Sequence, residues 1–300
     1  MKVLVTGANG FIGKHLVRYL RERGFNVIDL DLKSSTIIGD ISDWNFVSSL
    51  EHLNFDAIVH LAAMVEIKDS LDDTHRCYQV NSFGTLNLLE LAFKKKVDRF
   101  VYSSSANVYG LPLELPVKET TPFNPRTPYD YSKVVSEYLI QSYYTNRGLP
   151  IVILRSWKLF GEYESENKVI PRFIKSCLLN QPIPLYNGGR DTTDPYYILN
   201  YCYAVELALT KNEAIGEAFN VGTGSELSVR EIAETIKKMT DSKSELQFLP
   251  PRSPREATPM RSYPSIEKIQ SRLGYKPIVS FTEGLERTIK WMIERLNRPS

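Results

Sequence analysis

A tyrosine and a lysine four positions apart form the pair in this chain best suited to acid–base chemistry. Tyr129 and Lys133 fall in a segment whose pattern predicts a helix over residues 129–147, so both side chains share one helix face. A free tyrosine has a pKa of about 10, and a nearby ammonium favours the phenolate. Tyr129 is therefore the candidate base. Tyr131 is the competing phenol, but no lysine follows it four residues on.

A serine cluster precedes this pair and adds a second candidate for proton transfer. Ser103 and Ser105 end a buried strand expected over residues 97–105. The Ser105 hydroxyl can bind the same substrate oxygen as the phenol and share in the proton transfer. By itself, a tyrosine four residues before a lysine often marks two surface residues. Its position one loop after the serine cluster favours the catalytic interpretation.

Three regularly spaced glycines near the start of the chain predict a phosphate-binding turn. Gly7, Gly10 and Gly13 follow a short apolar strand over residues 3–6 and open a helix that runs to Gly24. The first glycine permits a tight turn, the second lets backbone N–H groups approach a pyrophosphate, and the third packs helix against strand. The helix N-terminus favours negative charge, so a dinucleotide is the expected ligand.

An acidic residue at the end of the second strand supports this interpretation. Asp31 ends the strand expected over residues 26–31, about 20 residues beyond the glycines, where a carboxylate binds the adenosine ribose. A carboxylate repels a 2′-phosphate, so the sequence favours NAD over NADP. Asp29 is the rival, but alternation along the strand directs it to the other face.

Strands and helices alternate along most of the chain. This order predicts an α/β fold with a doubly wound parallel sheet, in which ligands gather at the carboxyl ends of the strands. Residues 1–165, with a return of about 198–222, should form the dinucleotide-binding domain, and residues 166–300 a smaller α/β domain. The expected strands are 3–6, 26–31, 38–41, 56–63, 97–105, 150–154 and 218–221; the expected helices are 11–24, 43–53, 72–95, 129–147, 170–180, 200–210, 228–239, 265–273 and 281–296.

Composition narrows the range of partners. The 300 residues are 42% hydrophobic and carry a formal net charge of +2, so bulk charge demands neither nucleic acid nor an anionic membrane. No apolar run is long enough for a membrane span. The three cysteines lack paired spacing and the four histidines lack metal-ligand spacing, which predicts reduced thiols, no metal and a cytoplasmic location.

Taken together, these motifs resemble the extended short-chain dehydrogenase/reductase superfamily. The resemblance is specifically to the NAD-dependent sugar epimerase/dehydratase family typified by UDP-glucose 4-epimerase, and it covers essentially the whole chain. It implies a Rossmann fold, an NAD cofactor and a homodimer joined through the long helices after Asp72 and Tyr129. The segments that carry it are residues 5–13, 39–41, 60–63, 80–81, 103–110, 128–133, 169–171 and 219–224.

The resemblance also assigns site residues. Ser105, Tyr129 and Lys133 are the implied catalytic residues, and Lys133 would also hold the nicotinamide ribose. The implied cofactor-binding residues are Gly7, Asn9, Gly10, Phe11, Ile12, Gly13, Asp31, Asp40, Ile41, Leu61, Ala62, Ala63, Asn81, Ser103, Tyr129, Lys133 and Trp157. The implied substrate-binding residues are Ser105, Asn107, Tyr129, Lys158, Val169, Arg190 and Arg255.

The chain departs from the family pattern in its substrate half. Trp157 and Lys158 stand where the family usually has phenylalanine and asparagine, and Thr193 replaces a phosphate-binding arginine. Arg255 is expected to keep a diphosphate role, with Lys158 or Arg190 supplying a displaced positive charge. These changes bear on the identity of the nucleotide and sugar more than on the redox chemistry.

The expected function is that of an NAD-dependent nucleotide-sugar epimerase acting through a transient keto sugar. A 4,6-dehydratase of the family carries an Asp-Glu pair after the residue matching Ser105, whereas this chain has Ala106 and Asn107. Neither can serve as an acid or base near neutral pH. A dehydratase, decarboxylase or reductase of the same family is the alternative, and a non-catalytic NAD-binding regulator is an alternative of another class.

Overall fold

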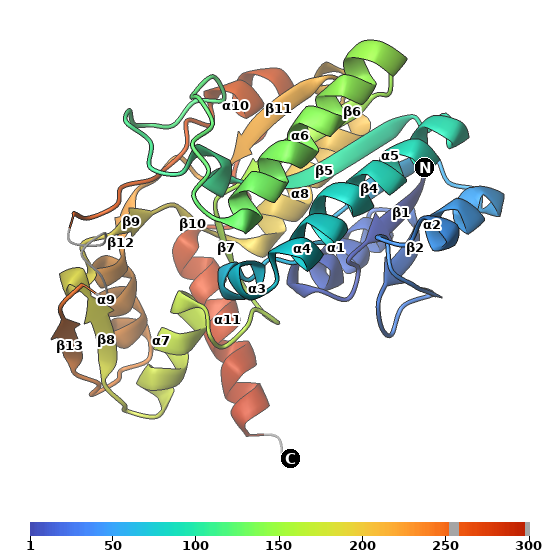
Figure 1. Cartoon of the computed structure of the whole chain (residues 1–300). Helices are drawn as coiled ribbons and strands as arrows, with labels where there is room; N and C mark the ends of the chain where they lie inside the picture. The colour runs from blue at the N-terminus through green and yellow to red at the C-terminus, as the bar shows by residue number, and fades with distance from the viewer. Residues whose placement is uncertain (252–257, 298–300) are drawn as a thin grey trace.

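A parallel sheet of seven strands forms the centre of the molecule. The computed structural model describes residues 1–251 and 258–297. In order across the sheet, the strands are β11 (Glu217–Val221), β6 (Ile151–Ser156), β5 (Arg99–Ser105), β4 (Ala57–His60), β1 (Lys2–Thr6), β2 (Asn26–Asp31) and β3 (Ile37–Ile38) (Figure 1). All six pairings are parallel. The predicted doubly wound α/β fold is therefore confirmed, including the return of a late strand to the sheet.

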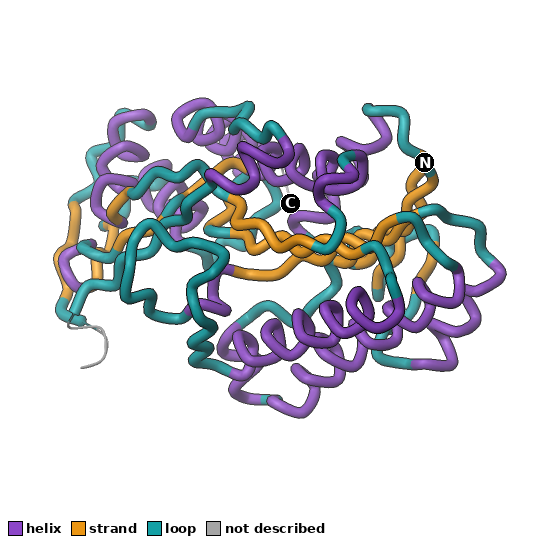
Figure 2. The backbone as a smooth tube through the Cα atoms, turned by 90° about the horizontal axis from the view of Figure 1, so that it is seen from above, coloured by secondary structure: helices purple, strands orange, loops and turns teal. Residues whose placement is uncertain are grey.

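Helices cover both faces of this sheet, as Figure 2 shows from above. On one face, α1 (Phe11–Glu22) packs against α8 (Ile198–Thr210); on the other, α5 (Gly84–Lys95) packs against α6 (Pro128–Arg147) and α2 (Trp44–Ser49). Alternate residues of β1 enter the two cores, with Val3 and Val5 in one and Leu4 in the other. The central strands β1, β4 and β6 are largely apolar because both of their faces are buried.

The helix expected over residues 72–95 is observed from Thr74 to Lys95 without a break. It consists of α4 (Thr74–Tyr78), a π-helical turn η2 (Gln79–Phe83) and α5. A short helix that was not expected, α3 (Ile67–Asp72), precedes it. Asp73 separates α3 from α4, since its side chain accepts a hydrogen bond from the Arg76 N–H and caps α4. The strand expected over residues 38–41 is also shorter and shifted, as β3 ends at Ile38.

The second half of the chain adds a smaller α/β part with three two-stranded pairs. In Figure 1 much of it forms a lobe at the lower left, around α7, α9, β8 and β13. Its elements are β7 (Lys158–Phe160) with β10 (Pro195–Tyr197), β9 (Thr192–Thr193) with β12 (Leu227–Ser228), β8 (Ile183–Tyr186) with β13 (Leu246–Leu249), and helices α7 (Val169–Leu178), α9 (Val229–Met239), α10 (Glu267–Leu273) and α11 (Phe281–Leu296). The division near residue 165 stays a prediction.

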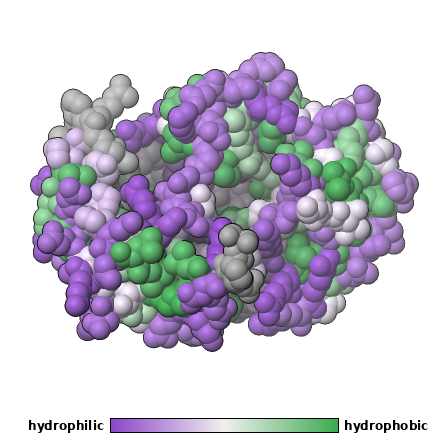
Figure 3. All heavy atoms as spheres, turned by 90° about the horizontal axis from the view of Figure 1, so that it is seen from below, coloured by the Kyte–Doolittle hydropathy of each residue, from purple (hydrophilic) through white to green (hydrophobic). Residues whose placement is uncertain are grey.

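Short single-turn helices complete the described chain, and its surface is mostly polar. These turns are η1 (Leu50–His52), η3 (Ala106–Tyr109), η4 (Asn187–Gly189) and η5 (Asn212–Ala214). Seen from below, hydrophilic side chains dominate, and hydrophobic ones gather in separate patches (Figure 3). Within residues 1–251 and 258–297, no helix has the length and apolar character needed to cross a membrane. The three cysteines are buried free thiols.

Candidate active site

The turn after β1 has the geometry of a phosphate-binding loop. Gly7 has a φ of +69°, and a Cβ on it would lie 2.7 Å from the backbone nitrogen of Ala62. A Cβ on Gly13 would collide with the carbonyl oxygen of Gly7, so α1 crosses β1 closely only because glycine is present. Gly10 is the N-cap of α1 and contributes no side-chain cap. The first N–H groups of a twelve-residue helix are thus left for a ligand.

Asp31 lies directly beside this turn. Its carboxylate accepts hydrogen bonds from the N–H of Asn9 at 2.9 Å and of Leu32 at 2.7 Å. Asp29, the rival carboxylate, is instead engaged by Arg21 at 2.7 Å and by the N–H and hydroxyl of Thr36. The end of β2 therefore presents Asp31 to the turn.

The remaining expected cofactor residues lie around the same strand ends. Phe11 and Ile12 form the first turn of α1, and Leu61, Ala62 and Ala63 follow β4 in half-buried positions. Asp40 accepts from Arg76 at 2.5 Å and from Ser42. Burial alone would raise the pKa of Asp40, but these partners hold that pKa below its usual value. Ile41 is buried in the core beside α5.

Asn81 is buried in the π-helical turn and joins three segments. Its side chain accepts from the N–H of Met64 at 2.7 Å and donates to the carbonyl of Met64 at 3.0 Å and to the Ser132 hydroxyl at 2.9 Å. The π-helical turn therefore lies where the Asn81 amide connects the loop after β4 to α6. Asn81 thus faces inward and bridges the π-helical turn to its neighbouring segments.

The N-terminal turns of α6 carry the tyrosine–lysine pair. Thr127 caps this helix, and Pro128 occupies its first position. Tyr129 and Lys133 are both buried, and the lysine Nζ lies 6.0 Å from the Tyr129 ring centroid. The same Nζ donates to the carbonyl of Ser103 at 2.8 Å. The predicted shared helix face is confirmed, and it is directed at the end of β5.

Burial controls the protonation of this pair. It raises the pKa of Tyr129 to about 12, although the hydrogen bond with Ser105 opposes the rise. It also lowers the pKa of Lys133 to about 8, although Glu137 opposes the fall. In the protein without cofactor, desolvation of the phenolate is therefore the largest influence on the pKa of Tyr129.

A buried ion pair supports the serine strand from behind. Arg155 donates to Glu137 at 2.7 Å with both side chains almost fully buried, and Glu137 accepts from Ser104 at 2.5 Å. Arg155 also donates to the Tyr109 hydroxyl at 2.6 Å. This network fixes β5 and β6 beside α6. The sequence analysis missed it; the only signal was a charged residue at the end of an apolar strand.

Lys158 begins β7, and its residue is exposed. Desolvation and the neighbouring Lys168 lower its pKa, while Glu164, Asp130 and Glu66 oppose the fall. Asp130 and Glu66 also raise the pKa of Tyr129, so both groups experience the same negative charges.

Glu164 has an unusual environment that was not predicted from the sequence. Burial raises the pKa of its carboxyl to about 8, and Lys168 and Lys158 oppose the rise. Its Oε2 is buried and has no hydrogen-bond partner among the residues that the structure describes. The only sequence signal was the run of acidic residues after Gly161.

The other expected substrate residues are more dispersed. Asn107 donates to Asp130 at 3.1 Å, which ties the turn after Ser105 to α6. Val169 is the exposed first residue of α7, and Arg190 donates to the backbone and side chain of Asn187. Trp157, an expected cofactor residue, stacks its ring on Tyr109 and donates from its indole nitrogen to the Ser262 hydroxyl. Arg255 lies outside the described residues.

The sequence matches the model of one known protein family. Residues 3–222 match the model described as the NAD dependent epimerase/dehydratase family. The chain belongs to this family. Its glycine turn, its serine cluster and its tyrosine–lysine pair all lie within the matched residues.

Members of the family with different activities are similar to this chain. An epimerase from Methanothermobacter thermautotrophicus is 34% identical, with a TM-score of 0.89 over 98% of this chain and 93% of its own. The UDP-glucose 4-epimerase of Thermotoga maritima is 28% identical, with a TM-score of 0.92 over 99% and 100%. A dTDP-D-glucose 4,6-dehydratase from Mus musculus is 33% identical over 97% of this chain and 88% of its own.

The cofactor of this family member is NAD, and the residues present fit it. The open N-terminus of α1 suits the pyrophosphate, and Asp31 suits an unphosphorylated ribose. Lys133 and Tyr129 lie at the end of β5, across β4 from the glycine turn. Among the described residues, no cluster of His, Cys, Asp and Glu could hold a metal ion.

Proposed function

We propose that this protein is an NAD-dependent nucleotide-sugar epimerase, similar to UDP-glucose 4-epimerase, that acts through a transient keto sugar. Relatives named as epimerases and as dehydratases are similar to it at comparable identity. The substrate class follows from both groups, since each acts on a glucose nucleotide by name. We favour an epimerase because the turn after Ser105 carries no side chain that could act as a further acid or base.

Tyr129, Ser105 and Lys133 are the proposed catalytic residues. NAD, when bound, supplies the acceptor for a hydride from the sugar carbon and a positively charged ring beside the phenol. Tyr129 takes the proton of the sugar hydroxyl, and Ser105 hydrogen-bonds the same oxygen. Lys133, fixed by the Ser103 carbonyl, stabilises the phenolate and holds the nicotinamide ribose. These intact residues argue against a non-catalytic NAD-binding regulator.

The turn after Ser105 contributes no additional acid or base. Elimination of water from a 4-keto sugar needs one group to take the C5 proton and another to protonate the departing C6 hydroxyl. Ala106 has no ionisable group, and the Asn107 amide is committed to Asp130. This arrangement favours epimerisation over the dehydratase alternative. It also weakens the decarboxylase alternative, in which a glutamate usually stands at the position of Asn107.

Lys158 is the proposed contact for the diphosphate of the substrate. Its residue is exposed at the start of β7, and its ammonium forms no ion pair with a carboxylate of the described residues. We assign residues 166–300 to substrate binding and residues 1–165, with about 198–222, to the cofactor. The pairing of β11 with β6 supports the return of that segment to the cofactor domain.

A homodimer joined through α5 and α6 is the proposed assembly. Exposed apolar and aromatic side chains gather on the segment before α5 and on α6. They are Leu71 (60% exposed), Phe83 (59%), Tyr131 (50%), Val135 (39%) and Tyr138 (64%). Apolar groups of this size that cluster on one face commonly mark an interface. The two helices pack against each other and would meet their symmetry-related copies in an isologous contact.

The test of the proposed activity is product identification. The NAD-loaded protein is incubated with UDP-, dTDP-, GDP- and CDP-sugars, and products are analysed by mass spectrometry and NMR. We expect an isobaric product with one inverted ring proton from at least one sugar. A product lighter by one water or one carbon dioxide would show a dehydratase or decarboxylase instead. Denatured protein should release NAD in the same experiment.

A further inference from the structure

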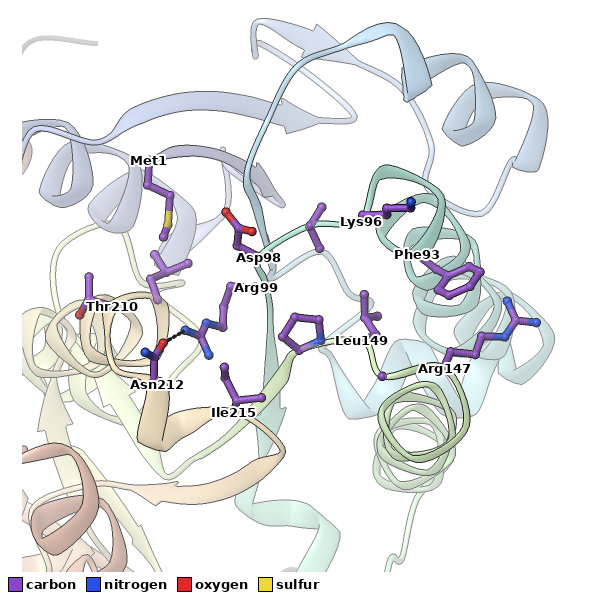
Figure 4. A pocket seen from close by; sticks show the side chains of 14 residues that line it. Met1, Phe93, Lys96, Asp98, Arg99, Arg147, Leu149, Thr210, Asn212 and Ile215 are labelled. Carbon is purple, nitrogen blue, oxygen red and sulfur yellow. Dashed lines mark hydrogen bonds between the residues drawn. The ribbon is translucent and has the colours of Figure 1, made fainter.

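A large cleft lies at the amino-terminal edge of the sheet, away from the candidate active site. It has a volume of about 880 Å³ and is formed where β5 and β6 begin and α5, α6 and α8 end (Figure 4). Its lining includes the charged residues Lys96, Asp98, Arg99 and Arg147. Arg99 begins β5 and Ser105 ends it, which separates the two sites by about 20 Å along the strand.

Arg99 is the unusual residue of this cleft. Its side chain is only 5% exposed, and its Nε and Nη1 have no hydrogen-bond partner among the described residues. Its Nη2 donates to the Asn212 side-chain oxygen over a long 3.4 Å, as Figure 4 shows. Burial lowers the pKa of Arg99, and the adjacent Asp98 opposes the fall. A buried guanidinium with one neutral acceptor lacks the compensation that buried charges normally have.

The rest of the lining combines positive charge with apolar walls. Lys96 and Arg147 are the other cations of the lining. Arg147 also forms an ion pair with Glu90, with a nitrogen–oxygen distance of 3.0 Å. Asp98 is the acidic residue of the lining, and its side chain is exposed. Phe93, Leu149, Pro150, Leu209 and Ile215 provide apolar surface. A site with one anchoring cation and apolar walls suits an organic anion.

We propose that this cleft binds a small organic anion, with a carboxylate or phosphate group against Arg99 and an apolar body against the aliphatic walls. Charge-assisted hydrogen bonds from a guanidinium to such an anion are stronger than those between neutral groups. The anion would supply the negative charge that the buried Arg99 guanidinium lacks, since the Asn212 amide is neutral. Because the cleft opens on the opposite edge of the sheet, its ligand does not compete with NAD or substrate.

The probes are phenyl phosphate, benzoate and neutral benzyl alcohol, titrated calorimetrically into NAD-loaded protein so that the glycine turn is already filled. Phenyl phosphate, benzoate or both should bind, and benzyl alcohol should bind at least tenfold more weakly than the better anion. A preference between the two anions assigns the ligand to the phosphate or the carboxylate class. Equal binding of benzyl alcohol would overturn the proposal.

Arg99→Met tests the anchor, with Arg272→Met as a matched change at an exposed arginine of α10. Arg99→Met should weaken anion binding at least tenfold, whereas Arg272→Met should leave it unchanged. Without probe, the melting temperature of Arg99→Met should be no lower than that of the wild type, because the change removes an uncompensated buried charge. Anion binding that persists in a folded Arg99→Met protein would assign the probe to another site and refute the proposal.

Discussion

Desolvation controls the protonation states of the side chains around Tyr129. The pKa of the phenol rises to about 12, that of Lys133 falls to about 8, and that of His60 falls to about 3. In all three cases burial is the largest cause, so the neutral form is favoured. Positive charge from the bound cofactor is therefore needed beside the phenol before Tyr129 can act as a base near neutral pH.

Tyr129→Phe should lower turnover by about 10² or more, the scale of general acid–base catalysis, while the NAD content stays near that of the wild type. Steady-state kinetics and release of NAD on denaturation measure both quantities. Tyr131→Phe is the matched control on the same helix, because that ring is half exposed. Near-normal turnover of Tyr129→Phe would end its assignment as the base.

His60 should make stability depend on pH. Its ring is fully buried between the hydroxyls of Thr6 and Thr85, and burial, followed by Lys133, lowers its pKa to about 3. A depressed folded-state pKa gives stability that is complete above the unfolded value of about 6.5 and is lost as pH falls toward 3. The loss approaches about 1.4 kcal/mol for each pH unit within that window.

Chemical denaturation of wild type and His60→Gln at pH 7 and pH 5 measures this contribution. The advantage of the wild type should shrink by about 1–2 kcal/mol between the two values, because only the wild type resists protonation at this position. Carboxylates that titrate in both proteins cancel in the comparison. An advantage that stays constant with pH would show that His60 is not neutral in the fold.

At the scale of residues, motifs with fixed spacing could be predicted and long-range partners could not. The tyrosine–lysine pair and the glycine turn follow from spacing along one helix or one turn. The Arg155–Glu137 pair and the buried Glu164 depend on tertiary packing, which has no signature in local sequence. The rise of the Tyr129 pKa by burial in the protein without cofactor could not be predicted either, because a sequence pattern gives neighbours and no measure of desolvation.

At the scale of elements, helix caps connect stability to the site. Thr127, which lies two residues before the catalytic tyrosine, caps α6 through a capping box with Asp130. Ser228 caps α9 in the same way with Glu231. Loss of such a cap costs about 1 kcal/mol. Thr127→Ala and Ser228→Ala should therefore lower the free energy of unfolding by similar amounts.

The two variants should differ in catalysis. Only Thr127→Ala loosens the helix turn that carries Tyr129, so only this variant should lower kcat, which we expect to fall several-fold. Ser228→Ala controls for the general effect of lower stability. Equal kcat values for the two variants at a temperature where both are folded would show that the α6 cap does not position the tyrosine.

Helix and strand positions were predicted well where hydrophobic periodicity is strong. The strand at Asn26–Asp31 and the helix at Phe281–Leu296 match their predictions. The separate short helix α3 and the π-helical turn were missed. Both depend on polar contacts, namely the Asp73 cap and the Asn81 bridge to Met64, that apolar spacing does not reveal.

At the scale of the whole molecule, the exposed apolar face on α6 predicts association. Tyr138→Glu places a charge at the most exposed aromatic residue of that face and should shift the protein from dimer to monomer in analytical ultracentrifugation. Phe248→Glu is the matched control, since Phe248 is 55% exposed on β13. A wild type that is already monomeric, or a Tyr138→Glu protein that stays dimeric, would contradict the proposed interface.

The most direct test of the proposed epimerase chemistry is the reaction in D₂O. Transfer of a hydride from a sugar carbon and its return to the same carbon exchanges no carbon-bound hydrogen with solvent, whereas elimination of water requires removal of the C5 proton. NMR and mass spectrometry of the recovered nucleotide sugar should show an epimer of unchanged mass, with no deuterium on any ring carbon. Deuterium on a ring carbon, or a product that has lost water, would contradict the account.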